Sequence, residues 1–213
     1  MSICYIVCAL DSQLDFVKAH GDLVIGADRG YLNLRRHNIT PDIVIGDFDS
    51  YSGDIECESI EKLPRIKDFT DGEVSIRYAI ENGYKKIIVY GAIGGDLDHT
   101  IANIAHCAKY TREGIDISFT DGKNTLFAVS CGSVCFSKEA SGRISVFAYG
   151  EKADGVCEKG LFYTLDNASL DAFIPLGVSN EFIGVESEIS VENGVLLIYT
   201  ARENFEKHLT RRK

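Results

Sequence analysis

Six aspartates follow strand-like apolar runs in the first half of the chain: Asp28, Asp47, Asp49, Asp71, Asp96 and Asp98. The runs that precede them cover residues 23–27, 43–46, 62–66 and 86–95. Ligands of an open parallel sheet bind at the carboxyl ends of its strands, so we expect these carboxylates to gather at one sheet edge. Packed carboxylates need compensating cations, and Mg²⁺ prefers oxygen ligands that it shares with phosphates. The pattern predicts a metal-dependent site that handles phosphates.

Flanking residues favour the same chemistry. The segment 46–50 (GDFDS) offers two carboxylates with intervening backbone N–H groups, and Gly91, Gly94 and Gly95 allow backbone to approach a phosphate chain. Each signal alone has a structural alternative. Asp71 could favour a helix dipole, Asp98 could be a helix N-cap, and His99 could lie on a helix surface. The coincidence of acidic positions at successive strand ends favours the functional interpretation.

Composition limits the classes of protein that fit. The 213 residues are 45% hydrophobic and 25% charged, which predicts a globular chain with a buried core. The 22 basic and 32 acidic residues give a net charge of -10, which argues against binding to nucleic acid or to an anionic membrane. No apolar run approaches the ~18 residues that span a bilayer, and no basic stretch precedes the first one, so we expect a cytoplasmic protein.

Cysteine usage agrees with a reducing compartment. The chain has 7 cysteines, an odd number without a CxxC pair, and most of them stand in apolar runs. This pattern predicts buried free thiols rather than disulfides or a zinc site.

Periodicity in the first 120 residues predicts an α/β fold. Apolar runs at 5–10, 23–27, 43–46, 86–90 and 115–119 are typical of strands buried on both faces. Helices are predicted over 30–37, 71–82 and 99–112. The middle helix has a capping box of Thr70 and Glu73 and a stop at Gly83. The alternation indicates a doubly wound, mostly parallel sheet.

The pattern changes after about residue 123. Strand-like runs at 125–130, 133–136, 143–149, 161–165, 187–191 and 195–200 are separated by Gly, Asn and Ser turns, with no predicted helix. This spacing is typical of an antiparallel β-sandwich. We therefore expect an α/β domain over 1–124 and a β-sandwich domain over 125–213.

Ordered motifs in both parts resemble a known family, the bacterial thiamine pyrophosphokinases. The motifs are ADRGY at 27–31, PDIVIGDFDS at 41–50, KDFTD at 67–71 and GGDLDHTIAN at 94–103. In the second part, LGVSNEF at 176–182 resembles the segment of this family that binds thiamine. Order and spacing match as well, so the resemblance covers essentially the whole chain.

The resemblance implies transfer of a pyrophosphoryl group from ATP to the hydroxyethyl oxygen of thiamine, giving thiamine diphosphate and AMP. It implies that domain 1–124 binds ATP and Mg²⁺, that domain 125–213 binds thiamine, and that the protein is a homodimer with thiamine near the interface. Direct in-line attack on the β-phosphorus needs no protein nucleophile. The catalytic residues that it implies are Asp47, Asp49, Asp71 and Asp98, of which Asp71 or Asp98 would accept the hydroxyl proton.

Further residues match the family's binding motifs. By resemblance the Mg²⁺ ligands are Asp47, Asp49 and Asp71. The residues implied in ATP binding are Asp28, Arg29, Gly46, Ser50, Lys67, Thr70 and Gly95. Ser179 and Asn180 match the segment that orients the thiamine pyrimidine.

One departure concerns Asp96, which stands between Gly95 and Leu97 where the family usually has an arginine. A carboxylate would repel a triphosphate at close range. Either Asp96 points to solvent and another cation compensates, or nucleotide affinity is weakened. Arg29, Lys67 and Lys123 are the candidates for compensation, with Arg29 first.

Three other functions compete with this interpretation. A related pyrophosphokinase acting on another heterocycle, such as a hydroxymethylpterin, would use the same phosphate chemistry. A phosphohydrolase with Asp47 or Asp49 as nucleophile would release phosphate without an acceptor, and it would leave the second part of the chain unexplained. A non-catalytic binder of thiamine or nucleotide would bind without turnover.

Overall fold

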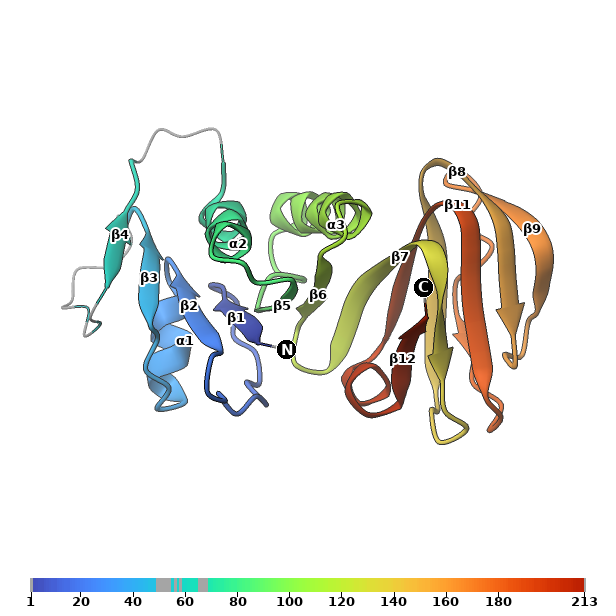
Figure 1. Ribbon diagram of the computed structural model, residues 1–213, viewed down its shortest axis with the longest axis horizontal. Coiled ribbons are helices and arrows are strands. Elements are labelled where there is room, and N and C mark those ends of the chain that lie inside the picture. The colour runs from blue at the N-terminus through green and yellow to red at the C-terminus, as the bar shows by residue number, and fades with distance from the viewer. Residues whose placement is uncertain (1, 49–54, 56, 58, 65–68, 213) are drawn as a thin grey trace. The chain divides into compact units, whose positions relative to one another are not determined.

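The computed structural model describes residues 2–48, 55, 57, 59–64 and 69–212 (Figure 1). Its contacts divide the chain into two compact units. The first unit is Met1–His106 with Ile115–Gly122, and the second unit is Cys107–Gly114 with Lys123–Lys213.

The first unit is built on a parallel sheet with the strand order β6-β5-β1-β2-β3-β4. The strands are β1 (Ile3–Val7), β2 (Leu23–Ala27), β3 (Ile43–Gly46), β4 (Ile60–Lys62), β5 (Lys86–Tyr90) and β6 (Asp116–Thr120). The central strands are buried on both faces, as continuous apolar runs require. The short strand β4 is exposed and was not among the strands that the apolar runs predicted.

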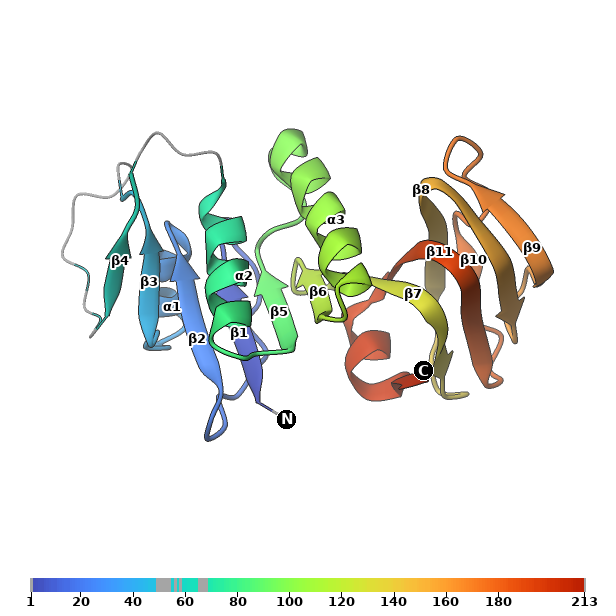
Figure 2. The same cartoon turned by 45° about the horizontal axis from the view of Figure 1, so that its top comes forward.

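Helices cover both faces of this sheet. Helix α1 (Gly30–Arg36) packs on β1 and β2 from one side, and α2 (Asp71–Glu81) packs on β1, β2 and β3 from the other, beside α3 (Leu97–Arg112) (Figures 1 and 2). The predicted capping box is confirmed, because the Glu73 backbone N–H donates to Thr70 Oγ1 at 3.1 Å. Gly83 follows α2 with a φ of +85°. The predicted doubly wound arrangement is confirmed.

The connection from β1 to β2 has no helix. Phe16 stacks on Tyr5 with ring centroids 4.1 Å apart and lies 5.4 Å from the Tyr90 ring centroid, so an irregular segment packs on the sheet here. The strand predicted over 5–10 is wrong in its second half, because β1 ends at Val7. Residues 8–10 leave the strand because their carbonyl groups bind a side chain of α1, described below.

The second unit is antiparallel. Its strands are β7 (Asn124–Phe136), β8 (Arg143–Lys159), β9 (Leu165–Asp171), β10 (Asn180–Glu181), β11 (Ser187–Ala201) and β12 (Leu209–Arg212). The order is β10-β8-β11-β7, with β12 also paired to β7 and β9 to β8. The predicted change from parallel strands with helices to antiparallel strands is therefore confirmed.

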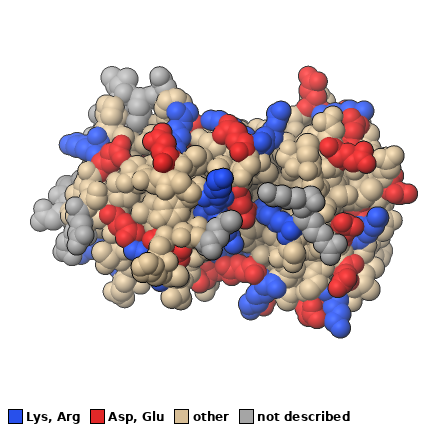
Figure 3. Space-filling model, viewed as in Figure 1, with Lys and Arg blue, Asp and Glu red and all other residues tan. Residues whose placement is uncertain are grey.

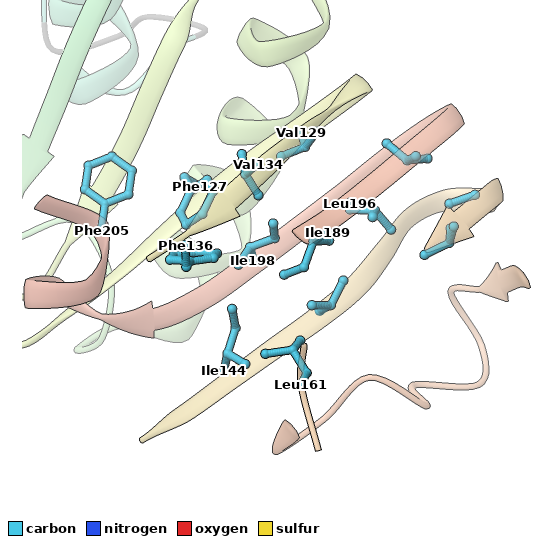
Figure 4. Close-up of a cluster of buried hydrophobic side chains, with 14 of the residues drawn as sticks. Phe127, Val129, Val134, Phe136, Ile144, Leu161, Ile189, Leu196, Ile198 and Phe205 are labelled. Carbon is cyan, nitrogen blue, oxygen red and sulfur yellow. The ribbon is translucent and has the colours of Figure 1, made fainter. Parts of the chain in front are cut away.

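Long bent strands replace several of the short ones that were predicted. The runs 125–130 and 133–136 form one strand, β7, and 187–191 and 195–200 form β11, with a register shift between Val191 and Val195. Both halves of each strand contribute to one core, in which Phe127, Phe136, Ile189 and Ile198 are buried (Figure 4). Each strand thus bends so that both of its halves contribute to this core, and the turn residues that separate the runs mark bulges.

Other details of the sequence prediction for this unit are wrong. Strands β10 and β12 were not predicted, and β8 extends to Lys159 where the predicted run ends at residue 149. The run 161–165 is not a strand: Leu161 makes an isolated bridge to Phe182, and β9 begins at Leu165. A short π-helix, η1 (Asn204–His208), was missed. It places Phe205 in the core, where the ring centroid lies 5.1 Å from that of Phe127.

Cysteines and charges add little to the architecture. All seven cysteines are thiols outside any disulfide. Cys4 and Cys107 are buried, Cys131 is exposed and the other four are partly buried, so the expectation that most are buried is wrong. Acidic and basic side chains are interspersed on the face drawn in Figure 3. Among the described residues, no helix has the length and apolar character needed to cross a membrane.

Candidate functional site

A cavity of about 240 Å³ opens at the carboxyl ends of β1 and β5 in the first unit. Strand β1 pairs with β2 on one side and β5 on the other, so the chain changes direction across the sheet at this point. Such switch points are where open α/β sheets bind ligands. The cavity is lined by Cys8, Ala9, Leu10, Ala27, Asp28, Thr70, Asp71, Gly72, Gly91, Ala92, Gly94, Asp96, His99 and Asn103.

A buried amide shapes the wall that follows β1. Asn33 of α1 is 2% exposed, and its Nδ2 lies 2.9, 3.2 and 2.9 Å from the carbonyl oxygens of Cys8, Ala9 and Leu10. Since C=O and N–H point in opposite directions across a trans peptide, the N–H of Ala9 lies on the side away from Asn33. It has no hydrogen-bond partner among the described residues. This wall can therefore donate to an anion.

Glycines bring neighbouring backbone close to that wall. A Cβ on Gly91 would lie 2.3 Å from the Leu10 carbonyl oxygen, and one on Gly95 would lie 2.5 Å from Leu10 Cδ2. Both glycines also have positive φ angles, +65° and +64°. Gly95 does not line the cavity, and the contact that the structure shows for it is packing against Leu10.

Asp71 reaches the cavity from the first turn of α2. Thr70 caps this helix, and Glu73 ties it to α3 through His106 Nε2 at 3.1 Å and pairs within the helix with Arg77 Nη2 at 2.9 Å. The Arg77 guanidinium lies 3.8 Å from the Phe69 ring centroid. These contacts fix the helix start, so Thr70 and Asp71 lie in defined positions.

The thiol of Cys8 lies in the same cavity. Burial, and secondly the Asp71 carboxylate, raise the pKa of Cys8 to about 12. The thiol is neutral at physiological pH and is therefore a poor nucleophile. This fits a reaction without a covalent protein intermediate.

Asp28 and Asp47 follow adjacent strands. Asp28 lines the cavity in a left-handed conformation with φ of +47°, and its N–H donates to the Ile45 carbonyl at 2.8 Å. A Cβ on Gly46 would lie 2.9 Å from Asp28 Cα, which explains a glycine there. Asp47 is partly buried at the next strand end but does not line the cavity. Gly46 thus positions Asp28.

The segment from β5 into α3 carries two of the predicted aspartates. Thr100 Oγ1 accepts from Gly94 N–H at 3.1 Å, and Asn103 Nδ2 donates to the Ala92 carbonyl at 2.7 Å. Asp96 lines the cavity. Asp98 does not, and its Oδ1 accepts from the His99 N–H at 2.8 Å.

Several sequence-predicted residues lie elsewhere. Asp49, Ser50 and Lys67 lie outside the described residues. Arg29 is exposed and does not line the cavity. Among the residues that the structure describes, no three His, Cys, Asp or Glu side chains are close enough to hold a metal ion together. The cavity thus unites Asp28, Thr70 and Asp71 from the predicted set.

Ser179 and Asn180 belong to the second unit, at the start of β10. Ser179 is exposed with φ of +61°, and its N–H donates to Ser145 Oγ at 3.0 Å. Asn180 is 3% exposed, and its amide binds Glu158, Tyr163 and Glu181. These two neighbours therefore differ: one faces solvent and one is part of the interior.

Sequence reasoning missed Asn33 and Glu158. The available signal for each was a polar residue inside an otherwise apolar pattern: Asn33 stands between Leu32 and Leu34, and Glu158 follows Val156 and Cys157. Buried polar groups need partners. That rule marks such residues as structurally demanding but does not identify what they bind.

Comparisons with known proteins agree with this arrangement. Residues 15–119 match the family model of the thiamin pyrophosphokinase catalytic domain, and residues 134–196 match that of its vitamin B1 binding domain. The chain is 30% identical over 184 residues to thiamine pyrophosphokinase of Bacillus subtilis, covering 83% of this chain and 86% of the relative.

Solved structures show the same fold. The crystal structure of the Bacillus subtilis thiamine pyrophosphokinase superposes with a TM-score of 0.83 at 24% identity, covering 94% of this chain and 99% of the other. That of the Geobacillus thermodenitrificans thiamin pyrophosphokinase gives 0.82 at 26% identity, covering 93% and 97%. The chain therefore belongs to the thiamin pyrophosphokinase family, whose members transfer a pyrophosphoryl group from ATP to thiamine, and it is a thiamine diphosphokinase.

Proposed function

We propose that the cavity of the first unit binds the ATP phosphates and that segment 176–182 of the second unit binds thiamine. The observation that carries this division is the cavity's place at the switch point of the parallel sheet. Thr70 and the N–H of Ala9 offer hydrogen bonds to phosphate oxygens there. The boundary near residue 124 and the roles of domains 1–124 and 125–213 follow from the same proposal.

Magnesium is the cation that we propose for this cavity. Asp28, Asp71 and Asp96 line it, and a polyphosphate beside three carboxylates needs a compensating positive charge. The donors are oxygens, which suit Mg²⁺. Of the proposed ligands Asp47, Asp49 and Asp71, Asp71 lines the cavity, Asp47 follows the neighbouring strand end outside the lining, and Asp49 lies outside the described residues. The bound ion would neutralise charge on the phosphates.

Asp71 is the better candidate to accept the thiamine hydroxyl proton. It lines the cavity, whereas Asp98 lies outside the lining and accepts a hydrogen bond from His99 N–H. Proton transfer needs a group within hydrogen-bond reach of the hydroxyl. Attack then proceeds in line on the β-phosphorus with AMP as the leaving group.

The remaining ATP contacts that we propose are Arg29, Gly46, Ser50, Lys67 and Gly95. The described part of the cavity lining contains no Lys or Arg, while Asp96 is part of it. The idea that Asp96 turns away and Arg29 compensates therefore has no support from the lining. Weakened nucleotide affinity is the alternative that this arrangement favours.

A homodimer is proposed because the second unit exposes many large apolar side chains. Phe173 is 87% exposed and Leu176 is 71% exposed. The others are Tyr149, Phe162, Tyr163, Ile174, Val178, Ile183 and Val185. Exposed apolar side chains in this number favour an interaction surface, and a second copy of the chain is the partner implied by the family resemblance. Ser179 adjoins this surface in sequence.

Phe173→Asp tests the dimer. A charge in a buried apolar interface costs free energy, so we expect the variant to shift toward monomer in analytical ultracentrifugation. Glu192→Ala, outside the apolar set, is the control. A wild-type protein that sediments as a monomer at micromolar concentration would contradict the proposal.

A cytoplasmic location is also proposed. All seven cysteines are free thiols, and thiols stay reduced in the cytosol. Fractionation of cells that produce the protein would test this.

The central experiment follows AMP and thiamine diphosphate together, by chromatography or phosphorus NMR, with ATP, Mg²⁺ and thiamine. We expect equal formation of both products and loss of both with EDTA. Formation of ADP or free phosphate would contradict the proposed chemistry, and binding of thiamine without turnover would indicate a non-catalytic binder. Conversion of a hydroxymethylpterin in preference to thiamine would indicate the related pyrophosphokinase.

A further inference from the structure

The amide of Asn180 has no capacity left for a ligand. Its Nδ2 donates to Glu158 Oε2 at 2.9 Å and to the Tyr163 carbonyl at 2.7 Å. Its Oδ1 accepts from the N–H groups of Tyr163 and Glu181, both at 2.9 Å. An amide has two N–H donors and two acceptor lone pairs, and all four are used. The side chain is also 3% exposed.

These bonds join three separate segments. The amide binds both the backbone N–H and the backbone carbonyl of Tyr163, which lies in the connection between β8 and β9. A neighbouring strand would bind the same two groups. Through Glu158 it is tied to β8 in the core, where the glutamate is 1% exposed. Glu158 Oε1 has no hydrogen-bond partner among the described residues. Within that part of the chain, the Asn180 amide is thus the single group bonded to this buried carboxyl.

The neighbouring residue Ser179 depends on this anchor. Its φ of +61° lies in the left-handed region, which is unfavourable for a residue with a Cβ unless the surroundings fix it. The N–H of Ser179 donates to Ser145 Oγ, and the Gly177 carbonyl accepts from Val146 N–H at 2.9 Å. The turn is therefore held on both sides, by β8 before it and by Asn180 after it.

We propose that Glu158 and Asn180 are positioning residues for thiamine, which fix the Ser179 turn so that the Ser179 hydroxyl faces the substrate. This inference rests on the proposed function, in which segment 176–182 binds thiamine. It assigns Asn180 an indirect role in place of direct contact with the pyrimidine, and it adds Glu158, which lies 22 residues away in sequence. Ser179 is then the member of the pair that touches the substrate.

The test changes Asn180 and Glu158 separately and together. Asn180→Asp removes both N–H donors and sets a carboxylate against Glu158, so we expect KM for thiamine to rise about tenfold while KM for ATP changes little. Glu158→Gln keeps an acceptor for Asn180 and leaves KM for thiamine near the wild-type value. In the double variant the glutamine introduced on β8 can donate to the carboxylate introduced on β10, so we expect part of the thiamine affinity to return. Glu151→Gln, exposed on the same strand β8, is the matched control.

The outcomes separate the two proposals. A purely structural role would move both KM values or kcat together, without rescue in the double variant, and that result would overturn the inference. So would an unchanged KM for thiamine in Asn180→Asp. Wild-type protein that fails to convert thiamine would instead overturn the proposed function. If Asn180→Asp does not fold, Glu158→Ala, which removes the acceptor without adding charge, is expected to give the same selective rise in KM for thiamine, and an unchanged value would contradict the inference.

Discussion

The two ligand-binding regions differ in what holds their functional groups. In the first unit, Asp28 and Asp71 stand on loops and a helix start, and the surrounding backbone is placed by sheet topology, by close glycine contacts and by Asn33. In the second unit, the Ser179 turn depends on one buried polar cluster of Asn180 and Glu158. In the first case the order of the strands brings the charges to one sheet edge and side-chain bonds shape only the backbone around them, whereas in the second case the turn itself depends on side-chain bonds.

This difference predicts different responses to substitution. A charge at the cavity can change without disturbing the sheet, because the strands β1, β2 and β5 are buried independently of it. A change that removes a hydrogen-bond partner from the polar cluster costs both stability and binding, because the groups of the cluster are desolvated.

The largest effect is expected for Asp71→Asn. Loss of the carboxylate removes a proposed Mg²⁺ ligand and proton acceptor, so kcat should fall by about 100-fold or more. Thermal denaturation should change little, because asparagine keeps the backbone carbonyl that accepts from Ser75 Oγ at 2.8 Å. Glu81→Gln at the other end of α2 is the control. Near-normal turnover of Asp71→Asn would remove Asp71 from the site.

Asn33→Ser tests the backbone wall of the cavity. A serine can satisfy at most one of the three carbonyls that Asn33 binds, so the peptides at 8–10 lose their orientation. We expect kcat/KM for ATP to fall about tenfold with little change in KM for thiamine. Asn82→Ala, an exposed asparagine that follows α2, serves as control. An equal effect on both substrates would break the contrast between the two regions.

Asp96→Arg reverses a charge that lines the cavity. Removing the repulsion of the triphosphate should lower KM for ATP by about threefold at low ionic strength, and by less at high salt. Initial rates at two salt concentrations measure this. A raised KM for ATP would show that Asp96 helps to bind the nucleotide, for example through a cation.

The smallest effect concerns stability. Burial raises the pKa of Glu158, and the Asn180 hydrogen bond lowers it in part. The folded state therefore binds this proton more tightly than the unfolded state, and stability falls as pH rises above the ordinary carboxyl range. Glu158→Gln removes this loss. At pH 8 we expect the variant to have a higher Tm than the wild type, by about 2 to 4 °C for each kcal/mol of stability that the ionised Glu158 costs. Near pH 4 we expect the two Tm values to be equal. A pH-independent difference would contradict the assignment.

The sequence predicted the first unit better than the second. Parallel strands buried on both faces give continuous apolar runs, so 23–27, 43–46 and 86–90 match β2, β3 and β5 residue for residue. The strand β1 was extended too far because Ala9 and Leu10 are apolar although they line the cavity. Apolarity cannot distinguish a strand from a cavity wall.

In the second unit, turn-forming residues were misleading. Gly132 lies inside β7 and Asn193 and Gly194 lie inside β11, where they mark bulges and bends in continuous strands. The positions of Ser179 and Asn180 were readable from the motif, but their opposite exposures were not. That distinction depends on Glu158 and Tyr163, which no local pattern connects to them.

The most direct test of the division between the two regions is isothermal titration of two variants with thiamine and with a non-hydrolysable Mg·ATP analogue. We predict that Asp71→Asn loses at least about tenfold in affinity for the nucleotide and keeps its affinity for thiamine, and that Asn180→Asp shows the reverse. The assignment of ATP to the first unit and thiamine to the second is wrong if either variant loses affinity for both ligands. It is also wrong if Asp71→Asn loses affinity for thiamine alone and Asn180→Asp for the nucleotide alone.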